Sequence, residues 1–206
     1  MFTGVVQAVG SIAAATSKGD GLRLAIAPGA LDVSDVALGD SIAVNGCCLT
    51  VVAKEGEGAS ARLAFDVSAE SLRCTTGLDG RAPVNLEKAL RLADRLGGHL
   101  MTGHVDGVGT VVAFAAVGGA GSSDGSWRLE IECPAEIARF VAAKGSIAVQ
   151  GVSLTVNGVD GARFHVNLIP HTLQATTLKS LAPGARVNIE VDLVARYVER
   201  LAGPAR

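Results

Sequence analysis

The apolar and polar residues of the chain alternate in short runs, typical of β-strands, and glycine, aspartate and asparagine separate these runs. In the first half the pattern predicts strands over residues 5–12, 22–26, 41–52, 61–67 and 84–86. In the second half it predicts strands over residues 102–114, 127–131, 146–156, 163–168 and 187–191. Many short strands with regular turns favour a β-barrel or a β-sandwich in each half.

Helical patterns are few. Residues 135–144, after Pro134, form the clearest helical segment, and residues 30–38 are its weaker counterpart in the first half. Residues 66–71 and 167–172 each lead into a short helical turn. Residues 118–126 are rich in glycine and serine, and we expect a mobile hairpin tip there.

The tail carries an apolar stripe at helical spacing, made of Leu193, Val194, Tyr197, Val198 and Leu201. Neither half of the chain needs this stripe for its own core. The pattern therefore predicts a helix that supports self-association. Packing of the same helix back across the two halves is the alternative that the pattern leaves open.

The two halves repeat each other in order. Residues 41–51 read SIAVNGCCLTV, and residues 146–156 read SIAVQGVSLTV. Three further blocks repeat in register: residues 3–6, 66–76 and 84–87 return as 102–105, 167–177 and 187–190. This spacing is too long for a solenoid and fits two tandem domains, which we expect at 1–99 and 100–191, followed by a tail at 192–206. Two folded copies imply two similar pockets.

Composition excludes several classes of function. The 206 residues are 49% hydrophobic, which is enough for two cores, and the net charge of −2 with few aromatic residues argues against nucleic-acid binding. No apolar run is long enough for a membrane span, and we find no targeting leader. The four cysteines, two of them adjacent at Cys47 and Cys48, do not make a disulfide framework, so we expect a cytoplasmic protein with free thiols. His99 and His104 have no acidic or thiol partner at ligand spacing, and no nucleotide-binding fingerprint is present, so we expect no metal and no cofactor.

Equivalent positions of the two copies carry different reactive groups: Cys48 and Ser153, Val5 and His104, Asn45 and Gln150, Glu70 and His171. Each difference also has a purely structural explanation, since a lone cysteine on a strand is usually a small buried apolar residue. The residues by themselves predict a two-domain β-protein with a duplicated, glycine-lined pocket that has become asymmetric.

Five blocks of the chain, taken together and in order, closely resemble riboflavin synthase. They are Met1-Phe2-Thr3-Gly4-Val5-Val6, Asn45-Gly46-Cys47-Cys48-Leu49-Thr50, Gly97-Gly98-His99-Leu100-Met101-Thr102-Gly103-His104, Gly151-Val152-Ser153-Leu154-Thr155 and Leu168-Ile169-Pro170-His171-Thr172. The resemblance extends from Met1 to about Arg196, with both copies in register.

The resemblance implies an all-β fold of two tandem six-stranded Greek-key β-barrels related by internal duplication, plus a C-terminal α-helix that assembles a homotrimer. It implies that each barrel binds one 6,7-dimethyl-8-ribityllumazine, and that two of them meet between barrels of neighbouring subunits. The implied reaction moves a four-carbon unit from one lumazine to the other without a cofactor. It gives riboflavin and 5-amino-6-ribitylaminouracil, the last step of riboflavin biosynthesis. Lumazine synthase is an implied candidate partner. The alternatives are a non-catalytic lumazine- or flavin-binding antenna protein and a structural barrel that binds nothing.

Carried over by position, the resemblance also implies the substrate-binding residues. The first pocket would use Gly4, Val5, Val6, Cys48, Leu49, Thr50, Asp66, Val67, Ser68, Ala69, Glu70 and Ser71. The second would use Gly103, His104, Val105, Lys144, Ser153, Leu154, Thr155, Asn167, Leu168, Ile169, Pro170, His171 and Thr172. Phe2 would pack against the rings near the inter-subunit site.

The implied chemistry gives some of these residues a catalytic role. A proton must leave the C7-methyl group of one lumazine, and His104 is the preferred acid or base because an imidazole titrates near neutral pH. Cys48 is the candidate nucleophile for the electrophilic C7. Ser41, Ser153 and Thr155 are candidates for positioning a water molecule or donating hydrogen bonds to developing charge.

Overall fold

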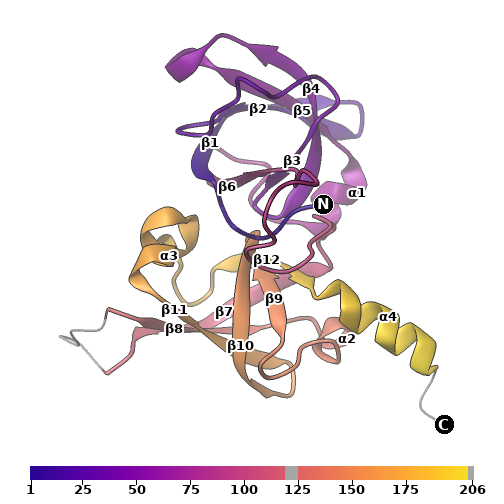
Figure 1. Ribbon diagram of the computed structural model, residues 1–206, viewed down its shortest axis with the longest axis vertical. Helices are drawn as coiled ribbons and strands as arrows, with labels where there is room; N and C mark the ends of the chain where they lie inside the picture. Colours follow the sequence, from indigo (N-terminus) through magenta and orange to yellow (C-terminus); the bar gives the residue numbers. More distant parts are fainter. Residues whose placement is uncertain (119–124, 204–206) are drawn as a thin grey trace.

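The protein folds into two closed β-barrels, one at each end of the molecule, with a helix projecting from the second (Figure 1). The structure is a computed structural model, and it describes residues 1–118 and 125–203. Barrel 1 contains β1 (Ala8–Lys18), β2 (Gly21–Ala27), β3 (Ser41–Val44), β4 (Cys47–Glu55), β5 (Arg62–Val67) and β6 (Pro83–Lys88). Barrel 2 contains β7 (Gly107–Ala116), β8 (Trp127–Glu132), β9 (Ser146–Val149), β10 (Val152–Asp160), β11 (Arg163–Leu168) and β12 (Arg186–Val191).

Both barrels have the same strand order. Around barrel 1 the order is β1-β2-β5-β4-β3-β6, and barrel 2 repeats it with the equivalent strands β7-β8-β11-β10-β9-β12. All pairs are antiparallel, and the exchange of neighbours makes each barrel a Greek key. This confirms the predicted all-β fold of two duplicated six-stranded barrels with a C-terminal helix.

Strand alternation separates core from surface in each barrel. In β5, Leu63, Phe65 and Val67 point into barrel 1, while Ala64 and Asp66 lie on its outer face. β11 repeats the pattern in barrel 2. The outer faces of β3, β4 and β5, and of their equivalents β9, β10 and β11, are therefore the surfaces on which the candidate site residues lie.

The single strands predicted over 41–52 and 146–156 are wrong: each segment is a hairpin of two strands. Asn45 and Gly46 turn the chain between β3 and β4 with φ angles of 47° and 82°, and Gln150 and Gly151 do the same between β9 and β10 with 51° and 76°. Two consecutive positive φ angles are the signature of a tight hairpin turn, for which Asn-Gly is the favoured pair. Because the residues on both sides of each turn are apolar, the hydrophobic pattern is continuous and predicts one long strand instead of two.

The helix predicted over 135–144 is also wrong in length, because α2 covers only Ala135–Ala138 and irregular turns follow. Its weaker counterpart over 30–38 contains no helix. In that loop the amine of Lys54 donates hydrogen bonds to the carbonyls of Val33 and Val36 at 2.5 and 3.1 Å. A lysine from a neighbouring strand therefore satisfies carbonyls that a helix would have paired internally.

The short helices at the ends of β5 and β11 follow the prediction. They are α1 (Ala69–Cys74), capped by the side chain of Ser68, and α3 (Pro170–Ala175), which begins with proline. The remaining short elements are two 3₁₀ turns, η1 (Gly58–Ser60) and η2 (Thr177–Ser180). Most of the predicted hairpin tip at 118–126 lies outside the described residues.

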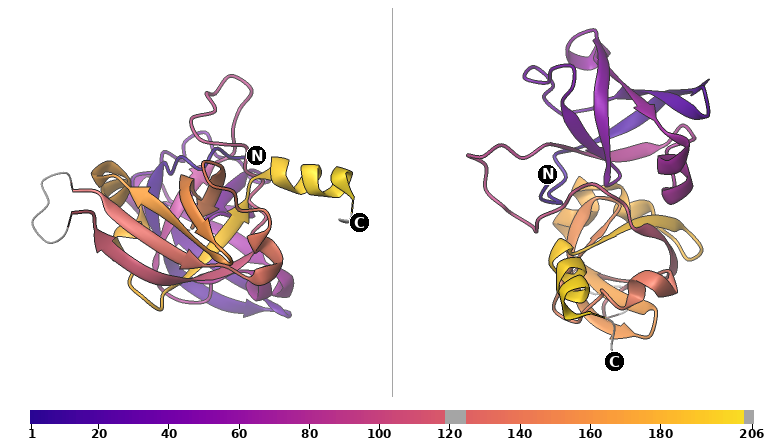
Figure 2. Two further views of the ribbon diagram at one scale, coloured as in Figure 1. Left: turned by 90° about the horizontal axis from the view of Figure 1, so that it is seen from below. Right: turned by 90° about the vertical axis from the view of Figure 1, so that its right-hand side faces the viewer.

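The tail forms α4 (Leu193–Ala202), which projects from barrel 2 (Figures 1 and 2). Its polar face is anchored, since Arg196 pairs with Asp106 and Glu199 lies 3.0 Å from Arg139. The apolar stripe faces away, with Val194, Tyr197, Val198 and Leu201 between 60% and 85% exposed. The alternative that this stripe packs back across the two halves is therefore wrong. Among the described helices, none has the length and apolarity needed to cross a membrane.

Candidate functional site

Two equivalent segments join the barrels, and each crosses to the other one. We call residues 2–7 arm 1 and residues 101–106 arm 2. Arm 1 precedes barrel 1, yet its Val6 packs against the core of barrel 2; arm 2 precedes barrel 2, yet its Val105 packs against the core of barrel 1. The strands predicted to begin at residues 5 and 102 are thus wrong at their starts, because these residues are bound to the opposite barrel and β1 and β7 begin at Ala8 and Gly107.

A buried glutamate holds each arm in place. Glu87 of β6 accepts hydrogen bonds from the N–H and hydroxyl of Thr3, at 2.6 and 2.7 Å, and from the N–H of Gly4 at 2.9 Å. Glu190 of β12 binds Thr102 and Gly103 in the same way, at 2.7, 2.8 and 3.0 Å. Burial raises the pKa of both carboxyls, although the three donated hydrogen bonds oppose it.

Polar side chains also tie the two barrels together symmetrically. Asn85 donates to the carbonyl of Gln150 at 2.9 Å, and Asn188 donates to the carbonyl of Asn45 at 3.0 Å. These carbonyls belong to the tight hairpin turns, whose glycines Gly46 and Gly151 touch each other. The relation between the barrels is therefore a near two-fold axis, and it fixes the two candidate sites relative to each other.

Site 1 lies where arm 2 meets β4. The N–H of Cys48 donates to the carbonyl of Gly103 at 2.8 Å. Gly103 has φ 78°, and a Cβ atom there would lie 2.6 Å from the Cβ of Cys48. Only glycine permits this approach, so the backbone of arm 2 lies directly beside Cys48, with His104 and Val105 following.

Site 2 lies where arm 1 meets β10. The N–H of Ser153 donates to the carbonyl of Gly4 at 2.9 Å. Gly4 has φ 76°, and a Cβ atom there would lie 2.6 Å from both the Cβ of Ser153 and the Sδ of Met101. Val5, which follows Gly4, is half exposed at this site.

The crossed arms correct the predicted grouping of pocket residues. The sequence predicts Gly4, Val5 and Val6 in the Cys48 pocket, but they lie beside Ser153 on barrel 2. It predicts Gly103, His104 and Val105 in the Ser153 pocket, but they lie beside Cys48 on barrel 1. The repeat shows which residues are equivalent, yet it carries no information on which copy an arm binds.

Strand alternation divides the remaining predicted residues. Leu49, Val67, Leu154 and Leu168 point into the barrel cores and offer a ligand only their backbone. The outer faces carry side chains that are exposed or half-buried: Ser41, Cys48, Thr50, Asp66, Ser68, Ala69, Glu70 and Ser71 on barrel 1, with Lys144, Ser153, Thr155, Asn167, Ile169, Pro170, His171 and Thr172 on barrel 2. Ser41 is paired with Thr50 across β3 and β4, and Ser146 with Thr155 across β9 and β10.

Phe2 is fully buried, so its ring is not free to pack against a ligand as the resemblance implies. Its ring packs with Ala43, Met101 and Ala148 between the two barrels, and a Cβ at Gly103 would come within 3.0 Å of it. Phe2 therefore supports arm 2 from behind and has no exposed surface with which to touch a ligand.

The charged residues of site 1 are already paired. Asp66 binds Arg23 and Lys18, and these hydrogen bonds hold its pKa at about 2. Glu70 binds Arg73 on α1, which likewise lowers its pKa to about 2. Both carboxylates are ionised at neutral pH and available only as hydrogen-bond acceptors.

The two adjacent cysteines differ in environment. Cys47 points into barrel 1, and burial raises the pKa of its thiol to about 12, so it stays protonated and unreactive at neutral pH. Cys48 is half-buried on the outer face, and no hydrogen bond to its side chain is found among the described residues. All four cysteines are free thiols.

Two histidines have neighbours that the sequence does not predict, one at site 2 and one further along β11. His99, in the linker between the barrels, has its Nδ1 2.7 Å from the Oγ of Ser153. His165 on β11 stacks beside Gly158, where barrel 1 pairs two alanines, Ala53 and Ala64. The sequence did carry a signal for His165, because the glycine opposite it makes room for its ring. His99 lies outside the repeated blocks, and although it belongs to one of the blocks that resemble riboflavin synthase, nothing in the sequence places it beside Ser153.

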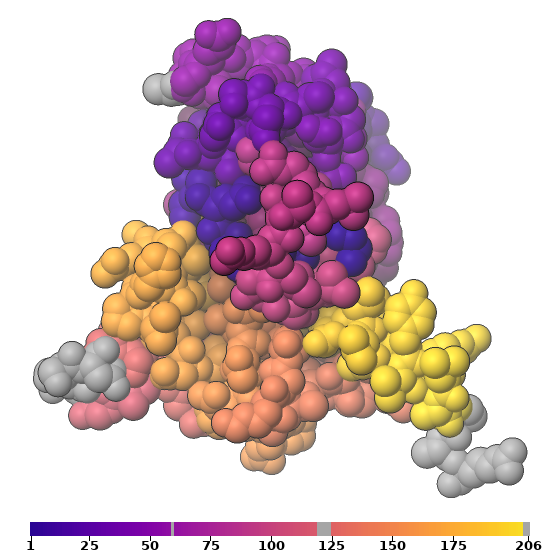
Figure 3. Space-filling view, viewed as in Figure 1, coloured from indigo at the N-terminus to yellow at the C-terminus, as the bar shows by residue number. Residues whose placement is uncertain are grey.

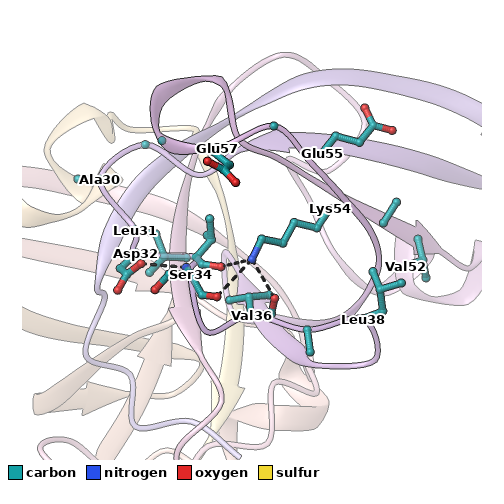
Figure 4. A pocket seen from close by; sticks show the side chains of 16 residues that line it. Ala30, Leu31, Asp32, Ser34, Val36, Leu38, Val52, Lys54, Glu55 and Glu57 are labelled. Atoms are coloured by element: carbon teal, nitrogen blue, oxygen red, sulfur yellow. Dashed lines mark hydrogen bonds between the residues drawn. The ribbon is translucent and has the colours of Figure 1, made fainter.

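A hollow of about 1150 Å³ lies at the far end of β4 from Cys48, between residues 29–38 and the β4–β5 hairpin (Figure 4). The amine of Lys54 points at the loop carbonyls rather than at open space. Within the described residues, no group of three or more His, Cys, Asp or Glu side chains is placed to hold a metal ion.

Comparison with known proteins agrees with this architecture. The lumazine binding domain family matches the chain twice, at residues 3–89 and 102–192. The riboflavin synthase of Mycobacterium bovis is 46% identical over 98% of both chains, and that of Photobacterium phosphoreum is 44% identical over 98% of this chain and 88% of its own.

A solved structure, LumP complexed with 6,7-dimethyl-8-(1'-D-ribityl) lumazine, superposes with a TM-score of 0.76 at 26% identity, covering 93% of this chain and 99% of LumP. The duplicated family match and the full-length relatives lead to one conclusion: the chain belongs to the riboflavin synthase family.

Proposed function

We propose that the protein catalyses the dismutation of two molecules of 6,7-dimethyl-8-ribityllumazine to riboflavin and 5-amino-6-ribitylaminouracil. The observation that carries the proposal is the pair of sites on the outer faces of the barrels. They are built alike, by a crossed arm against the hairpin strand, but present different reactive groups. A reaction between two copies of one molecule needs two similar sites, and the donor and acceptor roles need different side chains. Family membership and the lumazine complex of LumP support the same substrate.

Much of the rate in such a reaction comes from holding both reactants in contact, because oriented pairs reach effective molarities on the order of 10⁵ M and above. At site 1, exposed His104 is proposed to exchange the C7-methyl proton, and Cys48 to add to C7. Ser41, Ser153 and Thr155 are proposed to hydrogen-bond the substrate or a water molecule.

We further propose that the protein is a homotrimer in which site 1 of one subunit meets site 2 of its neighbour. The exposed apolar stripe on α4 supports this, because its polar face is anchored to barrel 2 and the stripe has no cover within the described chain. In this proposal residues 1–99 and 100–191 are the two lumazine-binding domains, and 192–206 is the assembly segment. Association with lumazine synthase stays a prediction. The four free thiols support the expected cytoplasmic location.

The test of assembly is a change in the middle of the stripe. Val198→Asp places a charge where the trimer buries apolar surface, so we expect mainly monomer by light scattering and a large loss of turnover. Arg200→Ala, on the same helix but off the stripe, is the matched control and keeps both. A trimeric, fully active Val198→Asp variant would refute the role of α4.

The test of function is a reaction with purified protein and 6,7-dimethyl-8-ribityllumazine as the only added compound. Riboflavin is followed by absorbance, and the remaining lumazine is counted. We expect two lumazines consumed for each riboflavin formed. Tight binding without riboflavin would favour an antenna protein, and no binding would favour a structural barrel.

A further inference from the structure

The linker between the barrels places a buried histidine against site 2. It leaves β6 at residue 89, loops out and returns over the junction of the barrels (Figures 2 and 3). His99 is only 7% exposed, and its backbone N–H donates a hydrogen bond to the carbonyl of Thr3 at 3.1 Å. Its Nδ1 lies 2.7 Å from the Oγ of Ser153, while its Nε2 is buried without a partner among the described residues.

The approach of the linker to Ser153 is built into the sequence. A Cβ atom at Gly98 would lie 2.0 Å from the carbonyl oxygen of Thr3 and 2.9 Å from the Oγ of Ser153. Any larger residue at this position would push the linker away from site 2. Gly98 and His99 therefore act together, the first by allowing contact and the second by making the hydrogen bond.

The unpartnered Nε2 indicates which way the hydrogen bond runs. Burial lowers the pKa of His99, with the charge of Asp192 opposing, so the ring is neutral near pH 7 and carries one N–H. If Nδ1 accepted the hydrogen of Ser153, the N–H on Nε2 would be a buried donor with no acceptor. If Nδ1 donates, only a lone pair is unpaired, and buried acceptors are left unpaired more readily than buried donors.

With Nδ1 donating, the oxygen of Ser153 is held by His99 and its own hydroxyl hydrogen is directed elsewhere. Ser153 lies on the outer face of β10, on the same side as Thr155 and next to the backbone of Gly4. Site 1 has no equivalent, because the side chain of Cys48 makes no hydrogen bond among the described residues. At this pair of equivalent positions, site 2 thus contains a pre-oriented O–H donor where the described part of site 1 has an unpaired thiol.

We propose that His99 is a positioning residue, which fixes Ser153 so that its hydroxyl donates a hydrogen bond to the lumazine in site 2 as negative charge develops on that ring. The inference rests on the proposed function. A donor that is oriented in advance stabilises an anion without reorganising during the reaction, which is why a fixed donor contributes more than a free hydroxyl.

The test compares amide replacements of His99. In His99→Asn the amide nitrogen takes the place of Nδ1 and can still donate to Ser153. In His99→Gln the longer side chain carries the amide nitrogen to the place of Nε2 and leaves Ser153 unheld. We expect His99→Asn to stay within about threefold of wild-type kcat and His99→Gln to lose about tenfold or more, with KM nearly unchanged in both.

A double-mutant cycle tests whether His99 acts through Ser153. His99→Gln is expected to slow the wild-type enzyme but to have little further effect in the Ser153→Ala background. Titration of lumazine fluorescence gives a second readout, and two sites should still fill in every variant. Thermal unfolding reports whether each variant is folded.

The outcomes separate this inference from the proposed function. No riboflavin from the wild-type protein refutes the function itself. With an active wild type, equal rates for His99→Asn and His99→Gln, or additive losses in the double-mutant cycle, refute the role of His99. Loss of one lumazine site in His99→Gln would make it a binding residue and would also overturn the proposal.

Discussion

Barrel 1 and barrel 2 are joined by nearly equivalent contacts, but some of the side chains that face their sites differ: Cys48 replaces Ser153, whereas Ser41 and Thr50 match Ser146 and Thr155. The glutamates that hold the arms and the asparagines that join the barrels occur in both copies, and their hydrogen bonds have nearly equal distances. On the outer faces, by contrast, barrel 1 has Cys48 at the position where barrel 2 has Ser153, and only Ser153 is hydrogen-bonded to His99. The comparison teaches that the duplication keeps the geometry of the two sites constant and leaves their chemistry free to diverge.

The largest effect on the equivalence of the two sites is expected from a substitution that displaces one arm from its site. Gly103→Ala must adopt a positive φ and meet Cys48, which together cost about 2–5 kcal/mol of the free energy of unfolding. We expect lost turnover and loss of lumazine binding at site 1, measured by fluorescence titration. Gly4→Ala is the symmetric change and should empty site 2. If Gly103→Ala affected the Ser153 side instead, the crossed arrangement would be wrong.

A second set of variants tests whether the reactive groups of site 1 are needed. His104→Gln and Cys48→Ser should each lower kcat, for His104 by about 10²-fold or more because it removes the proton exchanger, while lumazine binding stays largely intact. Steady-state kinetics and binding titration check this. Cys133→Ser, a buried cysteine of barrel 2, is the control for losing a thiol and should keep wild-type turnover. Unchanged turnover in both site variants would remove them from the mechanism.

The smallest effects, on stability rather than turnover, are expected at Glu87 and Glu190, which hold the two arms in the same way. Glu87→Gln turns an amide N–H₂ toward donors that need an acceptor, at a cost of about 1–3 kcal/mol, and Glu190→Gln should cost nearly the same. Chemical denaturation measures both. Clearly unequal losses would show that the two arms are not held equivalently.

The same residues predict a pH dependence. Each carboxyl has a pKa that is raised in the folded state above the value of 4.5, so its contribution to stability is fully present below pH 4.5 and is lost as the pH rises through the raised value. Wild-type stability should therefore contain a component that falls above pH 4.5, and the double Glu→Gln variant should lack it. Asp66 and Glu70 do not mask this trend, because their lowered pKa values place their titration at lower pH.

The sequence predicted the duplication and the barrels well, because both depend on local alternation that occurs twice. It failed where a signal was hidden or absent. The Asn45–Gly46 turn was masked by apolar residues on both sides, and residues 135–144 kept a helical pattern although only one turn is helical. The crossing of the arms could not be predicted, because Thr3-Gly4 and Thr102-Gly103 have the same sequence and could each bind either barrel. The contact between His99 and Ser153 could not be predicted either, because the two residues are 54 positions apart in the sequence.

The crossed arms have a consequence for the history and the engineering of the fold. Each barrel is completed by a segment that the chain attaches to the other, so the molecule is in effect a domain-swapped dimer fused into one polypeptide. A single repeat expressed alone would keep the glutamate that holds its arm, but the arm would lack the opposite barrel and the space beside Cys48 or Ser153 would be unfilled. Two such repeats could satisfy each other by exchanging arms, and a gene fusion would then make the exchange permanent and allow the halves to specialise.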